Sequence, residues 1–137
     1  MAVISELIRS ESDNTLSFGD YTLSAKSKLD GFNFGGDVYK VKTFNEITKL
    51  ERNGMFVYES VPGTAVEHLS ITDAQVSFTV EGPEDAQITL ELEPETDYDI
   101  TVAGQDAGTM KTNLGGKLSL SVELEEGASV EVIVKKM

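Results

Sequence analysis

Apolar and polar residues alternate along the last third of the chain, which is the pattern of a strand with one buried face. The alternation runs through four segments, 88–92, 98–102, 118–124 and 130–134. Successive side chains of a β-strand point to opposite faces of its sheet, so each segment predicts a half-buried strand. Strands of this kind form one layer, and the earlier part of the chain must supply the layer that covers it.

Shorter alternating segments precede this layer, and turn residues separate them. Gly19-Asp20, Pro62-Gly63 and Gly82-Pro83 are turn signals, because glycine and proline interrupt strands. The segments between the turns predict strands around 16–18, 21–28, 39–42, 55–60, 69–71 and 76–80. We therefore expect an all-β protein, an antiparallel β-sandwich of about nine or ten strands.

The domain organisation follows from the length and from the absence of a linker. A chain of 137 residues suits one domain spanning 1–137. The alternative is a division into residues 1–68, an aromatic-rich layer, and residues 69–137, an acidic layer. At most one short helix is expected, at the N-terminus, where Ile4, Leu7 and Ile8 fall on one helical face.

Residues 45–54 allow two interpretations. Asn45 is a suitable N-terminal cap for a short helix that ends at Gly54. Alternatively, Asn53-Gly54 forms a type I′ turn between two strands. We favour the hairpin, because Asn-Gly between alternating segments is the strongest short-range signal for that structure.

The charge is strongly negative and unevenly distributed. The net charge is −13, and residues 69–137 hold fourteen Asp/Glu against four Lys/Arg. Such a field repels phosphate groups, so nucleic acid and anionic membranes are not expected partners. Glu95, Asp97 and Asp99 are spaced like calcium ligands, but Ile100 stands where an EF-hand loop needs glycine, so no metal site is expected.

Few residues are available for catalysis. The chain has no cysteine and one histidine, His68, which we expect at a strand end without a special role. It has no Gly-x-Ser-x-Gly and no phosphate-binding glycine loop, so we expect no cofactor and no enzymatic activity. With 24 acids a carboxylate pair for glycoside hydrolysis remains a third alternative. No signal peptide or membrane span is apparent, which favours a cytoplasmic protein.

The segment Leu92-Glu93-Pro94-Glu95-Thr96-Asp97-Tyr98 resembles the corner of fibronectin type III and related immunoglobulin-like modules. In those modules a tyrosine hydroxyl returns to upstream backbone and fixes the crossover between sheets. The resemblance implies that Tyr98 is the corner residue, that Leu92 belongs to the core, and that the sandwich is immunoglobulin-like or jelly-roll-like. Three strand-like segments follow Tyr98, where a type III module has one, so the strand order stays open.

The chain as a whole resembles a family of small bacterial proteins that often carry the label endosialidase. The segments Ile47–Gly54, Phe56–Val66 and Thr112–Ser119 carry this resemblance. The label implies cleavage of sialic acid. Sialidases of the propeller type hold the substrate carboxylate with three arginines, whereas this chain has only Arg9 and Arg52, and we expect no such activity.

The placement of aromatic residues gives the remaining indication of function. Eight of the ten Phe and Tyr residues precede residue 60, and they either form the core of one layer or surface as a contact patch. The candidate contact residues are Phe32, Phe34, Tyr39, Lys40, Lys42 and Tyr58.

We expect a non-catalytic structural protein that associates with itself. Most lysines and arginines lie in the first half of the chain and most acids in the second. Unlike surfaces of two copies can therefore attract each other, giving a head-to-tail ring or filament. The alternative is a small module that binds carbohydrate or another ligand.

Overall fold

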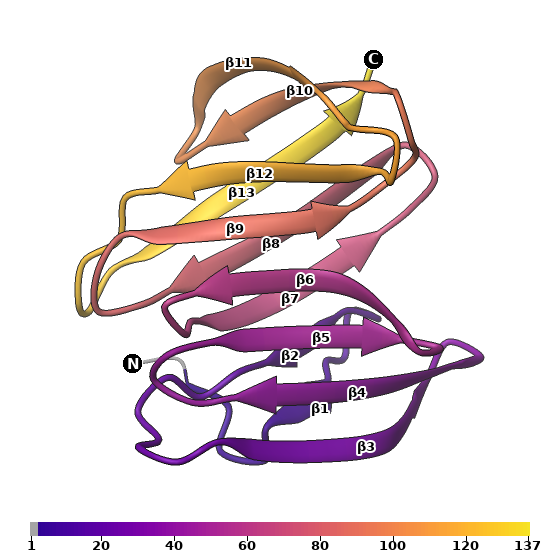
Figure 1. The fold of residues 1–137 in the computed structure, drawn as a ribbon. Helices are drawn as coiled ribbons and strands as arrows, with labels where there is room; N and C mark the ends of the chain where they lie inside the picture. The colour runs from indigo at the N-terminus through magenta and orange to yellow at the C-terminus, as the bar shows by residue number, and fades with distance from the viewer. Residues whose placement is uncertain (1–2) are drawn as a thin grey trace.

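Thirteen strands lie within residues 3–137, the part of the chain that the computed structural model describes, and they form two antiparallel sheets that face each other (Figure 1). The seven-stranded sheet has the order β1 (Ile8–Ser10), β2 (Leu16–Phe18), β7 (Ala65–Ile71), β8 (Gln75–Glu81), β13 (Ser129–Lys136), β10 (Asp97–Val102) and β11 (Gln105–Lys111). The six-stranded sheet has the order β12 (Lys117–Val122), β9 (Ala86–Glu91), β6 (Met55–Val61), β5 (Thr48–Arg52), β4 (Asp37–Thr43) and β3 (Ser27–Phe34). The expected all-β sandwich is confirmed.

The number of strands is higher than expected, because some edge strands lack an apolar face. All seven residues of β11 are exposed, and the strand is held by backbone pairing with β10. β1 has three residues, too few to show a period of two. Alternation therefore detects the strands that cover the core and misses those that only extend a sheet.

The expected N-terminal helix is wrong. Leu7 has a positive φ of 71°, outside the helical region, and the next residue begins β1. Ile4 and Ile8 are buried as the helical pattern requires, but they reach the core through a turn in which the amide of Leu7 donates to the carbonyl of Ile4. Pairing of β1 with β2 replaces the helix.

The hairpin interpretation of residues 45–54 is confirmed. β5 and β6 pair in antiparallel fashion on either side of Asn53-Gly54. Both turn residues have positive φ, 53° and 85°, as a type I′ turn requires. The side chain of Asn53 also accepts a hydrogen bond from the backbone amide of Val38, which ties the turn to β4.

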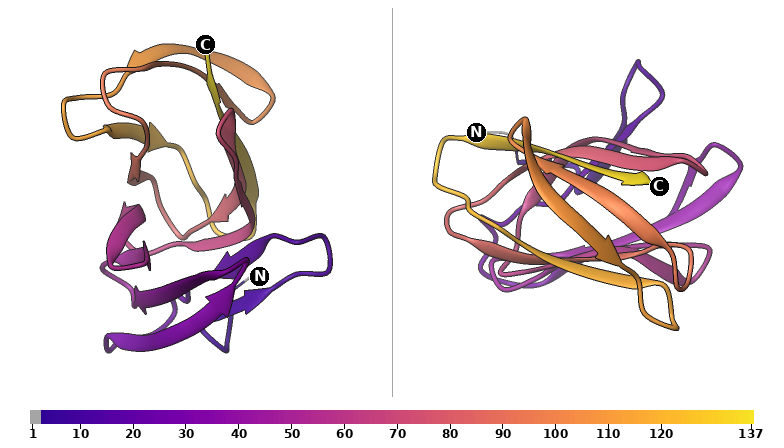
Figure 2. Two further views of the ribbon diagram at one scale, coloured as in Figure 1. Left: turned by 90° about the vertical axis from the view of Figure 1, so that its right-hand side faces the viewer. Right: turned by 90° about the horizontal axis from the view of Figure 1, so that it is seen from above.

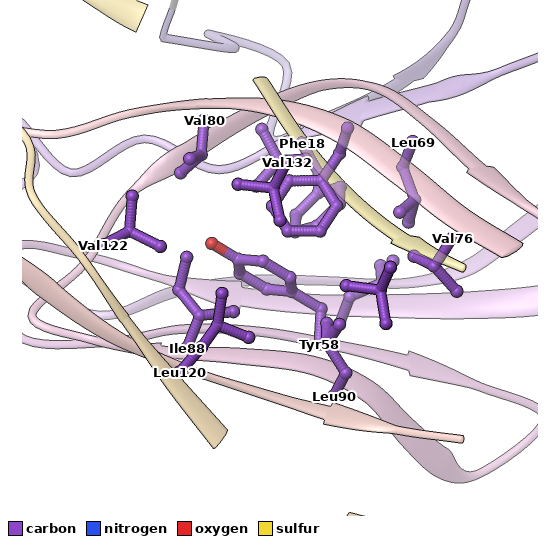
Figure 3. Packing of buried hydrophobic residues seen from close by; sticks show 14 of the residues in the cluster. Phe18, Tyr58, Leu69, Val76, Val80, Ile88, Leu90, Leu120, Val122 and Val132 are labelled. Atoms are coloured by element: carbon purple, nitrogen blue, oxygen red, sulfur yellow. The ribbon is translucent and has the colours of Figure 1, made fainter. Parts of the chain in front are cut away.

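Three aromatic rings form the centre of the core between the sheets, and Figure 3 shows two of them, Phe18 and Tyr58, among aliphatic side chains. Tyr58 is fully buried, and it meets Phe18 and Phe78 edge to face at centroid distances of 5.3 and 5.5 Å. Its hydroxyl forms a hydrogen bond of 2.8 Å with the hydroxyl of Thr64. Tyr58 is thus a core residue, and its expected place in a contact surface is wrong, since the alternation of β6 turns it inward.

The two layers do not follow the two halves of the sequence. β9 and β12 lie in the six-stranded sheet with the strands of the first half, and β1 and β2 lie in the seven-stranded sheet with those of the second. The layers face each other across the core in Figure 2, where the segment containing β10 and β11 (orange) curves over one end. No helix that could span a membrane occurs in the described residues.

Candidate functional site

The corner between β9 and β10 is fixed by Tyr98. Its buried hydroxyl accepts a hydrogen bond of 3.2 Å from the backbone amide of Glu93, and the hydroxyl of Thr112 donates to the carbonyl of the same residue at 2.6 Å. Leu92 is partly buried against the core, and its amide donates to the carbonyl of Gly116 at 2.6 Å. These hydrogen bonds connect the corner to the loop between β11 and β12, and the corner forms a wall at one end of the sandwich.

This wall borders an open cleft. The cleft lies at the end where β5 turns into β6, β7 into β8 and β9 into β10, on the right-hand side of Figure 1. Its volume is about 880 Å³, and residues from both sheets line it, among them Arg52, Met55, Ile71, Leu92, Tyr98 and Lys136. We call it the end cleft.

A second hollow of about 260 Å³ continues the end cleft toward β3 and β4. Arg52, Ile71 and Thr72 line both spaces, so Arg52 stands where the two spaces meet. Phe34 and Tyr39 line the second hollow, with their rings edge to face at 6.2 Å.

The expected contact residues do not form one surface. Tyr39 is buried, and Phe32 and Phe34 are partly buried beside it, on the inner side of the sheet at its β3 edge. Lys40 and Lys42 point to the outer side, because neighbouring residues of β4 alternate between faces. The aromatic and the basic residues must therefore be considered as separate features.

The lysines form a patch on the outer face of the six-stranded sheet. Lys28 lies directly opposite Lys42 on the neighbouring strand, and Lys42 lies directly opposite Lys49. The pKa of Lys42 is lowered, chiefly by the charge of Lys26, then by desolvation and by Lys28, Lys49 and Lys40. We call these residues the lysine patch: Lys26, Lys28, Lys40, Lys42 and Lys49.

Acidic residues gather in two loops. The loops 82–85 and 123–128 touch through a hydrogen bond of 3.0 Å from the amide of Leu124 to the carboxylate of Asp85. They contain no lysine or arginine, and their acids are all exposed. We call these residues the acidic loops: Glu84, Asp85, Glu123, Glu125 and Glu126.

His68 lies within β7, at a bulge with a positive φ of 56°, and the expectation of a strand-end position is wrong. Its Nδ1 is 2.9 Å from Oδ2 of Asp13 and 3.2 Å from the hydroxyl of Thr15. In a catalytic triad the carboxylate and the nucleophile bind different ring nitrogens. Both neighbours share one nitrogen here, so this cluster lacks the geometry of a nucleophilic site.

A metal site would need several ligands in one place. Within residues 3–137 no group of three or more His, Cys, Asp or Glu side chains is arranged to hold a metal ion. Comparison with protein-family models, curated proteins and solved structures finds no match. The end cleft, the lysine patch and the acidic loops are therefore interpreted from their own chemistry.

Of the residues in these features, the sequence indicates Lys40 and Lys42 of the lysine patch and Leu92 and Tyr98 of the end cleft, but not Arg52. Arg52 lies on the same inward face of β5 as Leu50. The sequence does not indicate this position, because a charged residue at a strand end normally turns to solvent. Lys28 and Lys49 come next to Lys42 only through strand pairing, which the sequence does not reveal.

Proposed function

We propose that the protein is a non-catalytic structural protein that associates with itself, with the lysine patch of one copy against the acidic loops of the next. The row of lysines carries this proposal. Like charges directly opposite each other on neighbouring strands destabilise a sheet, and Lys42 forms no ion pair with any described carboxylate. Glu51 lies opposite Lys40 and Glu59 lies opposite Lys49, whereas Lys42 has a lysine on each side. A surface with such a centre is suited to an anionic partner.

The acidic loops of a second copy have the required complementarity. They offer five exposed carboxylates to five lysines. The two surfaces differ, so the contact is heterologous and each copy keeps one free surface of each kind. Such contacts close into a ring or continue as a filament, and they account for a chain whose charge is segregated.

Exposed apolar side chains lie beside both surfaces and would contribute the affinity that charge alone does not. Val38 lies on the same outer face of β4 as Lys40, and 44% of its surface is exposed. Val61 is 53% exposed and pairs with Gln87, which closely follows the acidic residues of the loop 82–85. Valine contacts of this kind replace the Phe32–Phe34 loop, whose rings are directed inward, as the apolar part of the interface.

The variant Lys42→Glu tests the proposal. It places a carboxylate between Lys28 and Lys49, so the folded monomer should become slightly more stable in urea. Association, measured as mass by light scattering at low and high salt, should weaken, because the surface facing the acidic loops loses positive charge. Lys111→Glu is the matched control: it changes the net charge equally, but on β11. A parent that stays monomeric at all salt concentrations would refute the proposal.

A second candidate function is the binding of a small ligand. The observation in its favour is the end cleft, whose volume of about 880 Å³ lies in the range of ligand sites. Apolar side chains from both sheets line the cleft together with polar groups and charged groups of both signs. Carbohydrate, the ligand class that the sequence suggests, belongs to this second candidate.

A further inference from the structure

Arg52 is directed between the two sheets. It pairs with Tyr39 across β4 and β5. The next pairs on the same face, Val41–Leu50 and Thr43–Thr48, are buried between the sheets. Burial raises the pKa of Tyr39, and the guanidinium of Arg52 partly offsets that rise, so the two groups lie close together. An arginine has thus been placed on an inward face, at the open end of the sandwich.

The guanidinium of Arg52 has no carboxylate partner among residues 3–137. The other arginine, Arg9, behaves as expected in an acidic protein: its Nε lies 3.0 Å from the carboxylate of Glu11. Asp37, the carboxylate that lines the hollow next to Arg52, instead accepts a hydrogen bond from the side chain of Asn53 at 2.9 Å. Within residues 3–137 no buried side-chain nitrogen or oxygen lacks a hydrogen-bond partner, so the donors of Arg52 that Tyr39 does not engage are open to the cleft. A guanidinium presents these donors in one plane, which suits a carboxylate.

The surroundings of Arg52 suit an organic ligand rather than a bare ion. Met55 is exposed over 63% of its surface, and Ile71 and Leu92 line the same cleft. Gln75 is a neutral polar residue of the same lining, whereas the hydroxyl of Thr72 is engaged in the turn between β7 and β8, where it donates to the carbonyl of Gln75 at 3.2 Å. The second cation of the cleft, Lys136, is paired with Glu93, so Arg52 is the cation that remains for a ligand beside these apolar side chains.

We propose that the end cleft binds a small carboxylate ligand, with its carboxylate paired to Arg52 and its body on Met55, Ile71 and Leu92. A guanidinium matches a carboxylate with two parallel hydrogen bonds, which fixes the orientation of the ligand. The inference rests on the second candidate function, ligand binding, and it does not depend on self-association.

The charges around the cleft favour a single carboxylate over phosphate. Asp73 and Glu91 line the same space, and Glu93 is paired with Lys136 at its mouth. With the protein's net charge of −13, these carboxylates repel a doubly charged anion more strongly than a singly charged one. One unpaired arginine compensates one negative charge.

Amide chemical shifts in NMR titrations test this inference. The probes are hexanoate and glucuronate, an aliphatic acid and a sugar acid, each compared with its neutral counterpart, hexanamide or glucose. Inorganic phosphate is a further probe. We expect at least one acid to bind at about 10 mM or below, with shifts around Asn53, Thr72 and Gly115, and its neutral counterpart to bind more weakly.

Variants separate the role of Arg52 from general effects of charge. Arg52→Gln should weaken binding of the acid about tenfold or more, because a charge-assisted pair is lost. Arg52→Lys should weaken it less, since the charge remains without the planar fork. Arg9→Gln, the matched control, should bind like the parent. Lys42→Glu lies on the outer face and should also leave binding unchanged, so failure of self-association does not affect this test.

Three results would overturn the inference. The first is a parent that binds neither acid, and the second is a neutral counterpart or phosphate that binds as tightly as the acid. The third is unchanged affinity in both Arg52 variants, each shown by its spectrum to be folded.

Discussion

The hydroxyl of Tyr98 accepts a hydrogen bond from the backbone amide of Glu93, five residues upstream, at 3.2 Å. The bond fixes the corner where the chain passes from the six-stranded to the seven-stranded sheet, and it builds one wall of the end cleft. Removing the hydroxyl by Tyr98→Phe should lower the free energy of unfolding by roughly 0.5–1.5 kcal/mol, the usual contribution of one hydrogen bond. Urea denaturation measures it, and an unchanged midpoint would show that the corner does not depend on this bond.

Gly116 contributes to the same corner through close backbone approach. A Cβ at this position would lie 2.2 Å from the carbonyl oxygen of Leu92, and φ is +80°. Gly127 has a similar φ of +84° but no atom within 4 Å of the added carbon. Gly127→Ala should cost about 1 kcal/mol from backbone strain alone. Gly116→Ala should cost at least about 1 kcal/mol more from the clash. Equal losses in the two variants would contradict the close approach.

How much of this structure the sequence reveals depends on whether a residue's neighbours are near in the chain. The hairpin at Asn53-Gly54 was predictable, because its turn chemistry is local. The row of Lys28, Lys42 and Lys49 was not, since it joins three strands. The burial of Tyr58 depends likewise on residues far away in the chain, because Phe18 and Phe78 pack against it from other strands.

The burial of Tyr58 leads to a prediction that distinguishes a core residue from a contact residue. Tyr58→Phe keeps the packing of the ring and removes the hydrogen bond to Thr64, whose hydroxyl still pairs with Ser60 at 2.7 Å. Stability should fall by about 1 kcal/mol, measured in urea. The mass of the assembly in light scattering should not change. A variant with unchanged stability and a changed mass of the assembly would indicate that Tyr58 is a contact residue and not a core residue.

Tyr21 predicts an alkaline loss of stability. Burial, together with its hydrogen bond to Glu81, raises the pKa of its hydroxyl to about 12. A pKa raised on folding stabilises the protein below the unfolded value of about 10, and that stabilisation is lost as the pH rises toward the folded value. Between neutral pH and about pH 11 the parent should therefore lose about 1 kcal/mol through this group.

The variant Tyr21→Phe isolates this effect, because it has no hydroxyl to ionise at position 21. Urea midpoints of parent and variant, measured side by side across that pH range, should converge as the pH rises. Parallel pH profiles of the two proteins would show that the hydroxyl of Tyr21 is not protected by folding.

The most direct test of self-association is a mixture of two charge-reversed variants. One carries Lys28→Glu/Lys42→Glu/Lys49→Glu, which leaves the lysine patch with more negative than positive charges. The other carries Glu84→Lys/Glu125→Lys/Glu126→Lys, which leaves the acidic loops with more positive than negative charges. Each variant alone should be largely monomeric in sedimentation velocity. The altered surface of one copy has the same sign of charge as the unaltered surface that it would meet on the next copy of the same variant. Mixed in equal amounts, they should assemble, since the two altered surfaces attract each other and the two unaltered surfaces remain complementary. A mixture that sediments as monomers, or single variants that assemble like the parent, would contradict the account.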